Sequence, residues 1–171
     1  FLAPEYLSTG GLALLYEDEK APSYQLTVHG KIEKVPEFYS EGIVYQIFVD
    51  RFANGNENGQ LLDIKPNRYI YSSWDDTPSY IKGPNGEILR WDFYGGNLKG
   101  VIDKLDYLKQ LGVTCIYLNP IFLARSCHKY DTADYSKIDS MFGDEEIFKE
   151  LIEKAKNKNI YIILDGVFSH T

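Results

Sequence analysis

Two short stretches of the sequence carry side chains that could bind a polar ligand or exchange protons with it. Asp165 follows the apolar run at residues 160–164, and His170 comes shortly after it. His128 and Tyr130 stand close together in an earlier polar segment. Imidazole and carboxylate groups form hydrogen bonds with hydroxyl groups, and a tyrosine ring offers a flat apolar surface with a polar tip. These residue types could therefore bind a polar ligand, but they do not by themselves identify it.

Each of these residues also has a purely structural interpretation. Asp165 could cap a helix or form an ion pair at the end of a strand. His128 and Tyr130 could be ordinary loop residues, because one histidine and one tyrosine do not make a motif. Lys129 and Asp131 could pair with each other or with the loop, so neither is given a role.

The elements that must position these residues alternate between strands and helices. Apolar, β-branched runs predict buried strands at residues 43–49, 113–118 and 160–164. Between these runs, apolar residues recur at helical spacing in two segments, the first ended by Gly112 and the second preceded by Asp144. This order predicts a parallel sheet with right-handed crossovers. Asp165 then lies at the carboxyl end of the third strand.

Two segments of this part are expected as loops. Residues 52–96 are rich in Asn, Asp, Gly and Pro, and they exceed the usual length of a connection, which favours a function or an inserted subdomain. Trp74 and Trp91 in this segment could contact a glycan or close a small core. The second expected loop begins at Asn119 and Pro120 and runs to Gly143.

The N-terminal residues 1–41 have a different character. Glycines and prolines separate short alternating stretches at residues 12–16 and 24–29, which predicts antiparallel strands. So few strands bury too little surface to fold alone. Cys115 is expected to be a small core residue and Cys127 a loop thiol, because neither lies in a cluster with zinc-ligand spacing.

Composition and charge exclude several classes of function. The net charge of −7 is unfavourable for nucleic acid and for anionic membranes. The sequence has no apolar run long enough to span a bilayer and no signal peptide, although this leaves the cellular compartment open. A nucleotide-binding sheet would need a glycine-rich turn after the first strand, where Asp50, Arg51 and Phe52 stand instead. The aromatic content of 15% fits carbohydrate ligands, or tyrosines half buried at sheet margins.

Five ordered stretches resemble the α-amylase family of glycoside hydrolases, near its neopullulanase and cyclomaltodextrinase members. They are VYQIFVDRF at 44–52, GGNLKG at 95–100, LNPIF at 118–122, HKYDTADY at 128–135 and DGVFSH at 165–170. Residues 1–41 resemble the end of the β-sandwich and the linker that precede the barrel in that subgroup. The resemblance implies that residues 42–171 form the first three strands of an incomplete (β/α)₈ TIM barrel, since a whole barrel needs about 250 residues.

The family resemblance implies retaining hydrolysis of α-glucosidic bonds in starch-like glucans and malto-oligosaccharides. The nucleophile and the general acid of this family come from later strands, so we expect no catalytic residue in this chain and no activity of these residues alone. Two alternatives remain open. One is a transglycosidase or isomerase of the same family, and the other is a non-catalytic relative that binds glycans.

The resemblance also implies roles for the four residues with which we began. His170 would hydrogen-bond the primary hydroxyl of the glucose at the cleavage point, and Asp165 would order the floor of the site below it. Tyr130 would form the platform under the same glucose, and His128 would face the same pocket.

No cofactor is expected to be required, and calcium is the one candidate. Asn54, Asn56 and Asn97 resemble a calcium loop of the neopullulanase group, but they have amides where carboxylates are usual. Ser169 stands where many relatives have a calcium-binding Asn, and its side chain is shorter. An Asn/Gly turn is therefore the favoured interpretation. The open edge of a three-stranded sheet is a further expected feature, through which the isolated chain could self-associate.

Overall fold

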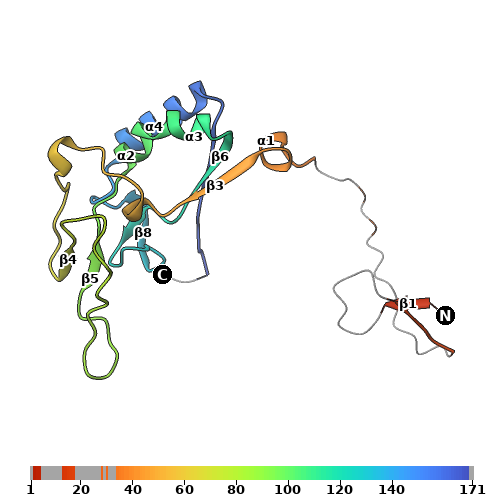
Figure 1. Cartoon of the computed structure of the whole chain (residues 1–171), viewed down its shortest axis with the longest axis horizontal. Helices are drawn as coiled ribbons and strands as arrows, with labels where there is room; N and C mark the ends of the chain where they lie inside the picture. Colours follow the sequence, from red (N-terminus) through yellow and green to blue (C-terminus); the bar gives the residue numbers. More distant parts are fainter. Residues whose placement is uncertain (1, 5–12, 18–27, 29, 31–33, 170–171) are drawn as a thin grey trace. The chain divides into compact units, whose positions relative to one another are not determined.

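The computed structural model describes residues 2–4, 13–17, 28, 30 and 34–169, and it divides the chain into two compact units, Phe1–Lys34 and Val35–Thr171 (Figure 1). In the first unit, β1 (Leu2–Pro4) pairs antiparallel with β2 (Ala13–Leu15). The strand expected at residues 24–29 lies almost entirely outside the described residues. The assignment of residues 1–41 to a β-sandwich remnant therefore stays a prediction, as does the domain boundary at residue 42.

The second unit contains the expected parallel sheet. Its strands are β3 (Ile43–Ile47), β6 (Val113–Leu118) and β9 (Tyr161–Leu164), in the spatial order β3-β6-β9. Both pairs are parallel, and β6 lies in the middle. The three-stranded sheet is confirmed, and β9 ends directly before Asp165.

Helices cover one side of this sheet (Figure 1). They are α2 (Leu98–Asp103), α3 (Leu105–Gln110) and α4 (Glu145–Asn157), and a single turn, α1 (Glu37–Ser40), precedes β3. The side chains of Asn97 and Asp144 accept hydrogen bonds from the first turns of α2 and α4. Gly112, at φ +88°, allows the chain to turn into β6.

The two faces of the sheet differ because successive strand residues point to opposite sides. On the helical side, apolar residues of the strands pack against the helices and form the core, which includes Ile47, Ile116, Leu118, Leu105, Leu108 and Leu151. On the other side, the strands present Val44, Gln46, Tyr117 and Ile163 to an open hollow. The core therefore holds the strands in register, while the opposite face borders this hollow.

The long segments that were expected as loops contain additional strands. The strand expected at residues 43–49 ends at Ile47, and the short helix η1 (Val49–Arg51) follows it. The first long segment then includes the short helix η2 (Glu57–Gly59) and pairs β4 (Arg68–Ile70) with β5 (Trp91–Phe93). The second forms a hairpin of β7 (Phe122–Ala124) and β8 (Thr132–Ile138). This hairpin carries His128 and Tyr130 between its strands.

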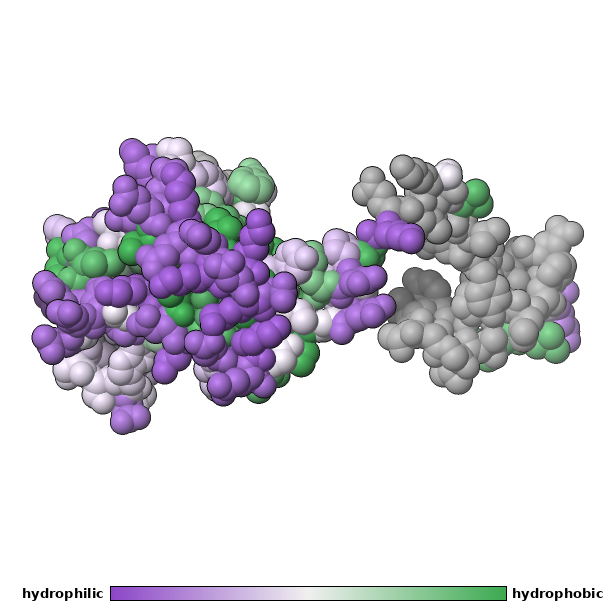
Figure 2. All heavy atoms as spheres, turned by 90° about the horizontal axis from the view of Figure 1, so that it is seen from above, coloured by the Kyte–Doolittle hydropathy of each residue, from purple (hydrophilic) through white to green (hydrophobic). Residues whose placement is uncertain are grey.

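Polar residues dominate the face of the larger unit that Figure 2 shows, with apolar patches between them. No helix among the described residues has the length and hydropathy needed to cross a membrane. Cys115 and Cys127 are both free and buried. Cys127 lies in a loop, as expected, but the fold buries its thiol.

Candidate functional site

Asp165 lies at the edge of an open hollow of about 860 Å³ on the side of the sheet away from the helices. All three strands contribute to this hollow, whose lining consists of Tyr39, Val44, Gln46, Tyr117, Tyr130, Ile163 and Asp165. The backbone N–H of Asp165 donates to the Leu118 carbonyl at 3.1 Å, so the pairing of β9 with β6 fixes its position. The residue is only 9% exposed, and its carboxylate is directed to this polar side.

Tyr130 reaches Asp165 across the hollow. Its hydroxyl donates to Asp165 Oδ2 at 2.7 Å, which joins the β7–β8 hairpin to the end of β9. This hydrogen bond, together with burial, raises the pKa of Tyr130 to about 12, so the phenol remains a proton donor at neutral pH. The structure therefore brings together two of the predicted site residues that are far apart in sequence.

Gln46 and Tyr117 also line this hollow, although neither was singled out from the sequence. They lie on the face of β6 and β3 that Asp165 shares directly after β9, and Gln46 Nε2 donates to Asn119 Oδ1 at 2.7 Å. Burial and the nearby Asp165 carboxyl raise the pKa of Tyr117. The signal was present in the alternation of polar and apolar residues within β3 and β6, because a strand buried on both faces would not need these polar side chains.

His128 lies beside Tyr130 but lines a neighbouring hollow of about 420 Å³ with Trp91 and Phe48. Its ring centroid is 5.8 Å from that of Tyr130 and 5.3 Å from that of Trp91, which it meets edge to face. The backbone N–H of Tyr130 donates to His128 Nδ1 at 3.1 Å, so a neutral ring carries its proton on Nε2. Burial lowers the pKa of His128, although Asp131 opposes this shift. The fourth predicted site residue, His170, lies outside the described residues.

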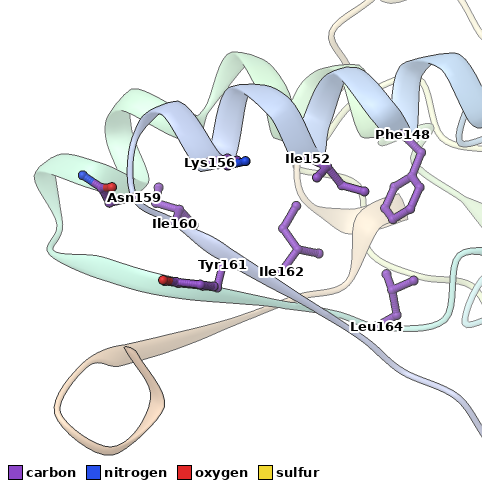
Figure 3. Close-up of a pocket in the computed structure, with 8 residues that line it drawn as sticks. All are labelled: Phe148, Ile152, Lys156, Asn159, Ile160, Tyr161, Ile162 and Leu164. Atoms are coloured by element: carbon purple, nitrogen blue, oxygen red, sulfur yellow. The ribbon is translucent and has the colours of Figure 1, made fainter. Parts of the chain in front are cut away.

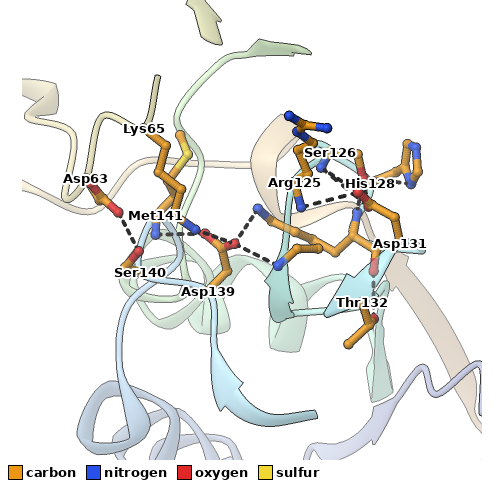
Figure 4. Close-up of polar contacts among 12 residues, drawn as sticks. Asp63, Lys65, Arg125, Ser126, His128, Asp131, Thr132, Asp139, Ser140 and Met141 are labelled. Atoms are coloured by element: carbon orange, nitrogen blue, oxygen red, sulfur yellow. Dashed lines mark hydrogen bonds and ion pairs between the residues drawn. The ribbon is translucent and has the colours of Figure 1, made fainter. Parts of the chain in front are cut away.

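The hairpin loop that carries His128 and Tyr130 is closed by its own polar groups (Figure 4). Asp131 accepts hydrogen bonds from the backbone N–H groups of Arg125 and Ser126 and from the Ser126 hydroxyl. The Ser126 hydroxyl also accepts from the backbone N–H of Lys129 at 2.9 Å. Asp131 thus pairs with the loop backbone.

Lys129 turns away from Asp131 into the interior and forms an ion pair with Asp139, with 2.8 Å between Nζ and Oδ2. Both side chains are completely buried. Asp139 also accepts from Lys65 Nζ at 3.0 Å and from the backbone N–H groups of Ala124 and Met141. Burial would raise the pKa of Asp139, but the two lysines outweigh this effect and lower it. We call these residues, Lys65, Lys129 and Asp139, the Asp139 cluster.

Asn54, Asn56 and Asn97 form a hydrogen-bonded turn. Asn54 Oδ1 accepts from Asn56 N–H and from Asn97 Nδ2, while Asn97 Oδ1 accepts from Gly55 N–H and Gly100 N–H. Two of the three amide oxygens thus already have two donors each, and a cation would have to displace them. Within the part of the chain that the structure describes, no three His, Cys, Asp or Glu residues form a metal-binding group.

Asp50, at the end of the first strand segment, is fully buried and supports the beginning of the long loop. It accepts from the backbone N–H groups of Tyr94 and Gly95 and from Arg51 Nε at 2.8 Å. Gly96 lies so close to this turn that a Cβ atom would be 2.0 Å from the Val49 carbonyl oxygen. These contacts explain why Asp-Arg and Gly-Gly occur at these two positions, and they favour a structural role for both.

Comparisons with known proteins agree with this architecture. Residues 46–171 match the family model described as alpha amylase, catalytic domain. The chain is 45% identical to an amylopullulanase of Thermoanaerobacter thermohydrosulfuricus, covering 90% of the chain and 11% of the relative, and 43% identical to neopullulanase 2 of Thermoactinomyces vulgaris, covering 90% and 24%.

Among solved structures, the cyclic alpha-maltosyl-(1→6)-maltose hydrolase of Arthrobacter globiformis superimposes with a TM-score of 0.61 at 35% identity, over 76% of this chain and 26% of that one. The chain thus spans only a small part of the relatives that it matches. The catalytic domain of this family is a TIM barrel, with which the three-stranded parallel sheet is consistent. The chain belongs to the α-amylase family of glycoside hydrolases.

Proposed function

We propose that this chain supplies the first three strands of a barrel that hydrolyses α-glucosidic bonds in starch-like glucans and malto-oligosaccharides. The observation that carries the proposal is the hollow in which Asp165 and Tyr130 meet at 2.7 Å, at the carboxyl end of β9. In TIM-barrel enzymes the carboxyl ends of the strands hold the active site. The names of the relatives, which include amylopullulanase and neopullulanase, support the same class of substrate.

In this proposal the chain binds and orients one glucose ring. The face of Tyr130 packs against the apolar face of the sugar, and the Asp165 carboxylate accepts hydrogen bonds from sugar hydroxyl groups and from Tyr130. His128 presents a neutral ring from the adjacent hollow, and His170 contacts the primary hydroxyl group. A bound sugar would thus meet one negative charge and several neutral hydrogen-bonding groups.

The bond-breaking groups come from outside these 171 residues. Retaining glycosidases use a carboxylate nucleophile and a carboxylic acid about 5 Å apart. Asp165 has Tyr130 as its partner, and no second carboxylate lines its hollow among the described residues. We therefore propose that residues 1–171 alone are inactive and that a longer protein carries both groups.

The test compares the 171-residue chain with the full-length protein on maltotriose, pullulan and β-cyclodextrin. The full-length protein is expected to release reducing sugar, and NMR of the first product is expected to show the α-anomer. The 171-residue chain is expected to release none. Turnover by the short chain, or a β-anomeric first product, would contradict the proposal.

We also propose that the outer edge of β9 promotes self-association of the 171-residue chain. An apolar groove of about 540 Å³ lies along this edge, where Phe148 and Ile152 of α4 face Ile162 and Leu164 of β9 (Figure 3). An edge strand also has unpaired backbone groups. Size-exclusion chromatography at several concentrations is expected to show a rising apparent mass. A constant monomer mass would contradict this part of the proposal.

The asparagine turn is proposed to work without calcium. The Asn54 and Asn97 side-chain oxygens each already accept two hydrogen bonds, which supports this interpretation. Removing calcium with EDTA is expected to leave the melting temperature unchanged. A rise of several degrees when millimolar calcium is restored would instead identify a bound ion.

A further inference from the structure

Lys129 lies between the two proposed sugar-binding residues of the hairpin loop, yet its own side chain never reaches the hollow. Its side chain is 0% exposed, while Tyr130 next to it extends in another direction and meets Asp165. Lysine is almost never fully buried unless it is paired. The residue therefore requires an explanation that the sugar site alone does not give.

The backbone of Lys129 has a conformation that its residue type disfavours. Its φ is +61°, in the left-handed region that glycine and asparagine normally occupy. The sequence places a long cationic side chain there instead. Contacts of this side chain must therefore compensate for the unfavourable backbone geometry.

Those contacts fasten the loop to the body of the unit. The ammonium group pairs with Asp139 at 2.8 Å and lies 5.3 Å and 4.9 Å from the ring centroids of Phe93 and Phe142. Asp139 is itself held by Lys65 and by two backbone N–H groups. Figure 4 shows Asp139 and the Asp131 turn as neighbouring centres of polar contacts. One rigid anchor thus acts on the loop residue that directly precedes Tyr130.

We propose that Lys129 is a positioning residue for sugar recognition: its pairing with Asp139 fixes the left-handed turn that holds the Tyr130 hydroxyl on Asp165. This inference rests on the proposed function, because it concerns the same hollow. Lys129 does not touch the substrate and acts through Tyr130. Two backbone hydrogen bonds extend from this turn. The N–H of Lys129 donates to the Ser126 hydroxyl, and the N–H of Tyr130 donates to His128 Nδ1, so the turn also positions the second sugar-binding side chain.

The experiment compares Lys129→Met with Lys65→Met in the full-length protein, with β-cyclodextrin and maltotriose as substrates. Both variants remove one ammonium group from Asp139, but Lys65 comes from the long loop and holds no sugar-binding residue. Lys129→Met is expected to lose kcat/KM on the order of 10- to 100-fold, as displacement of a site residue by about 1 Å can do. Lys65→Met is expected to remain within about threefold of the wild type.

Three further measurements separate positioning from a general loss of structure. Lys129→Arg, which keeps the charge, is expected to recover part of the lost kcat/KM. In a Tyr130→Phe background, Lys129→Met is expected to have little additional effect, because the hydroxyl that it positions is already absent. Melting temperatures show how far each variant is destabilised. If Lys129→Met does not fold, Lys129→Arg in both backgrounds takes its place.

Equal kcat/KM values for the two methionine variants would overturn the inference, as would full additivity with Tyr130→Phe. A wild-type protein that cleaves no α-glucan would refute the proposed function instead. In that case, isothermal titration with maltotriose still compares Lys129→Met with Lys65→Met, and equal affinities would refute the positioning role separately.

Discussion

Two buried aspartates of this chain have opposite surroundings. Asp139 is sealed in the interior, where two lysines and two backbone N–H groups satisfy its carboxylate. Asp165 lies beside an open hollow, and Tyr130 is its hydrogen-bonding partner there. A buried charge that is fully paired fixes structure, whereas one that keeps acceptor capacity toward an open space can still bind a ligand. This difference supports the proposal that Asp165 binds the ligand, while Asp139 serves as the structural scaffold.

The largest expected effect comes from breaking the scaffold. Asp139→Asn leaves the buried Lys129 ammonium without a counter-charge, which is expected to cost about 3–5 kcal/mol in the free energy of unfolding. Chemical denaturation of the full-length variant checks this value. Leu151→Ala, a core change on the helical side, serves as a control of similar size, at about 2–5 kcal/mol. A loss below 1 kcal/mol for Asp139→Asn would show that the cluster is not an anchor.

The second expected effect concerns the open aspartate. Asp165→Asn is expected to reduce kcat by a factor on the order of 100 to 1,000, because preorganised electrostatic contacts at the reacting sugar are lost. Its melting temperature should stay near that of the wild type, because no cation among the described residues pairs with Asp165 and would lose its partner. A large fall in stability with activity retained would invert the roles of the two aspartates.

Tyr130→Phe tests the link between the two regions. The change removes one hydroxyl that donates to a carboxylate and keeps the aromatic platform, so a loss in kcat/KM of about 10- to 100-fold is expected. Tyr135→Phe offers a matched control, because its hydroxyl donates to a backbone carbonyl, that of Val167, outside the hollow. Equal losses of kcat/KM in the two variants would indicate that the hairpin is disturbed in general and that the Asp165 contact makes no specific contribution.

The smallest expected effect is a dependence on pH. Burial lowers the pKa of Lys129 from 10.5 to about 8, although Asp139 opposes this shift, and Lys65 and Arg68 also face the group. As the pH rises through about 8, Lys129 loses its proton and its ion pair in the folded protein, so kcat/KM is expected to fall by up to about tenfold.

The stability of the fold is expected to change with pH in the direction opposite to kcat/KM. Between about pH 8 and 10.5 the unfolded chain still binds the Lys129 proton while the folded chain does not, so this residue stabilises the fold as the pH rises. Parallel pH profiles of kcat/KM and melting temperature check both statements, with Lys65→Met as the control. A kcat/KM profile that is flat from pH 7 to 9.5 would contradict the expectation.

Much of this architecture could be predicted from the sequence. The apolar runs predicted the three parallel strands, and the position of Asp165 after the last run placed it at the carboxyl end of β9. The β7–β8 hairpin could not be predicted, because its pairing joins residues across a polar loop. Lys129 was left without a role for the same reason. Its partner Asp139 is near in sequence, but only the fold turns the two side chains toward each other.

The family resemblance, and not local sequence, singled out Tyr130 and His128. The structure then separated them, since Tyr130 meets Asp165 and His128 lines the adjacent hollow. Gln46 and Tyr117 joined the site only when strand pairing placed them on one face. Such residues are recognisable when each strand is examined for the side that lacks covering helices.

A crystal structure of the full-length protein with bound maltotriose would show whether the hollow at Asp165 binds sugar. We expect a glucose ring packed on Tyr130, with a sugar hydroxyl within hydrogen-bonding distance of Asp165 and the Lys129–Asp139 pair unchanged beneath the loop. A sugar bound elsewhere, with the hollow at Asp165 filled by another segment of the protein, would contradict it.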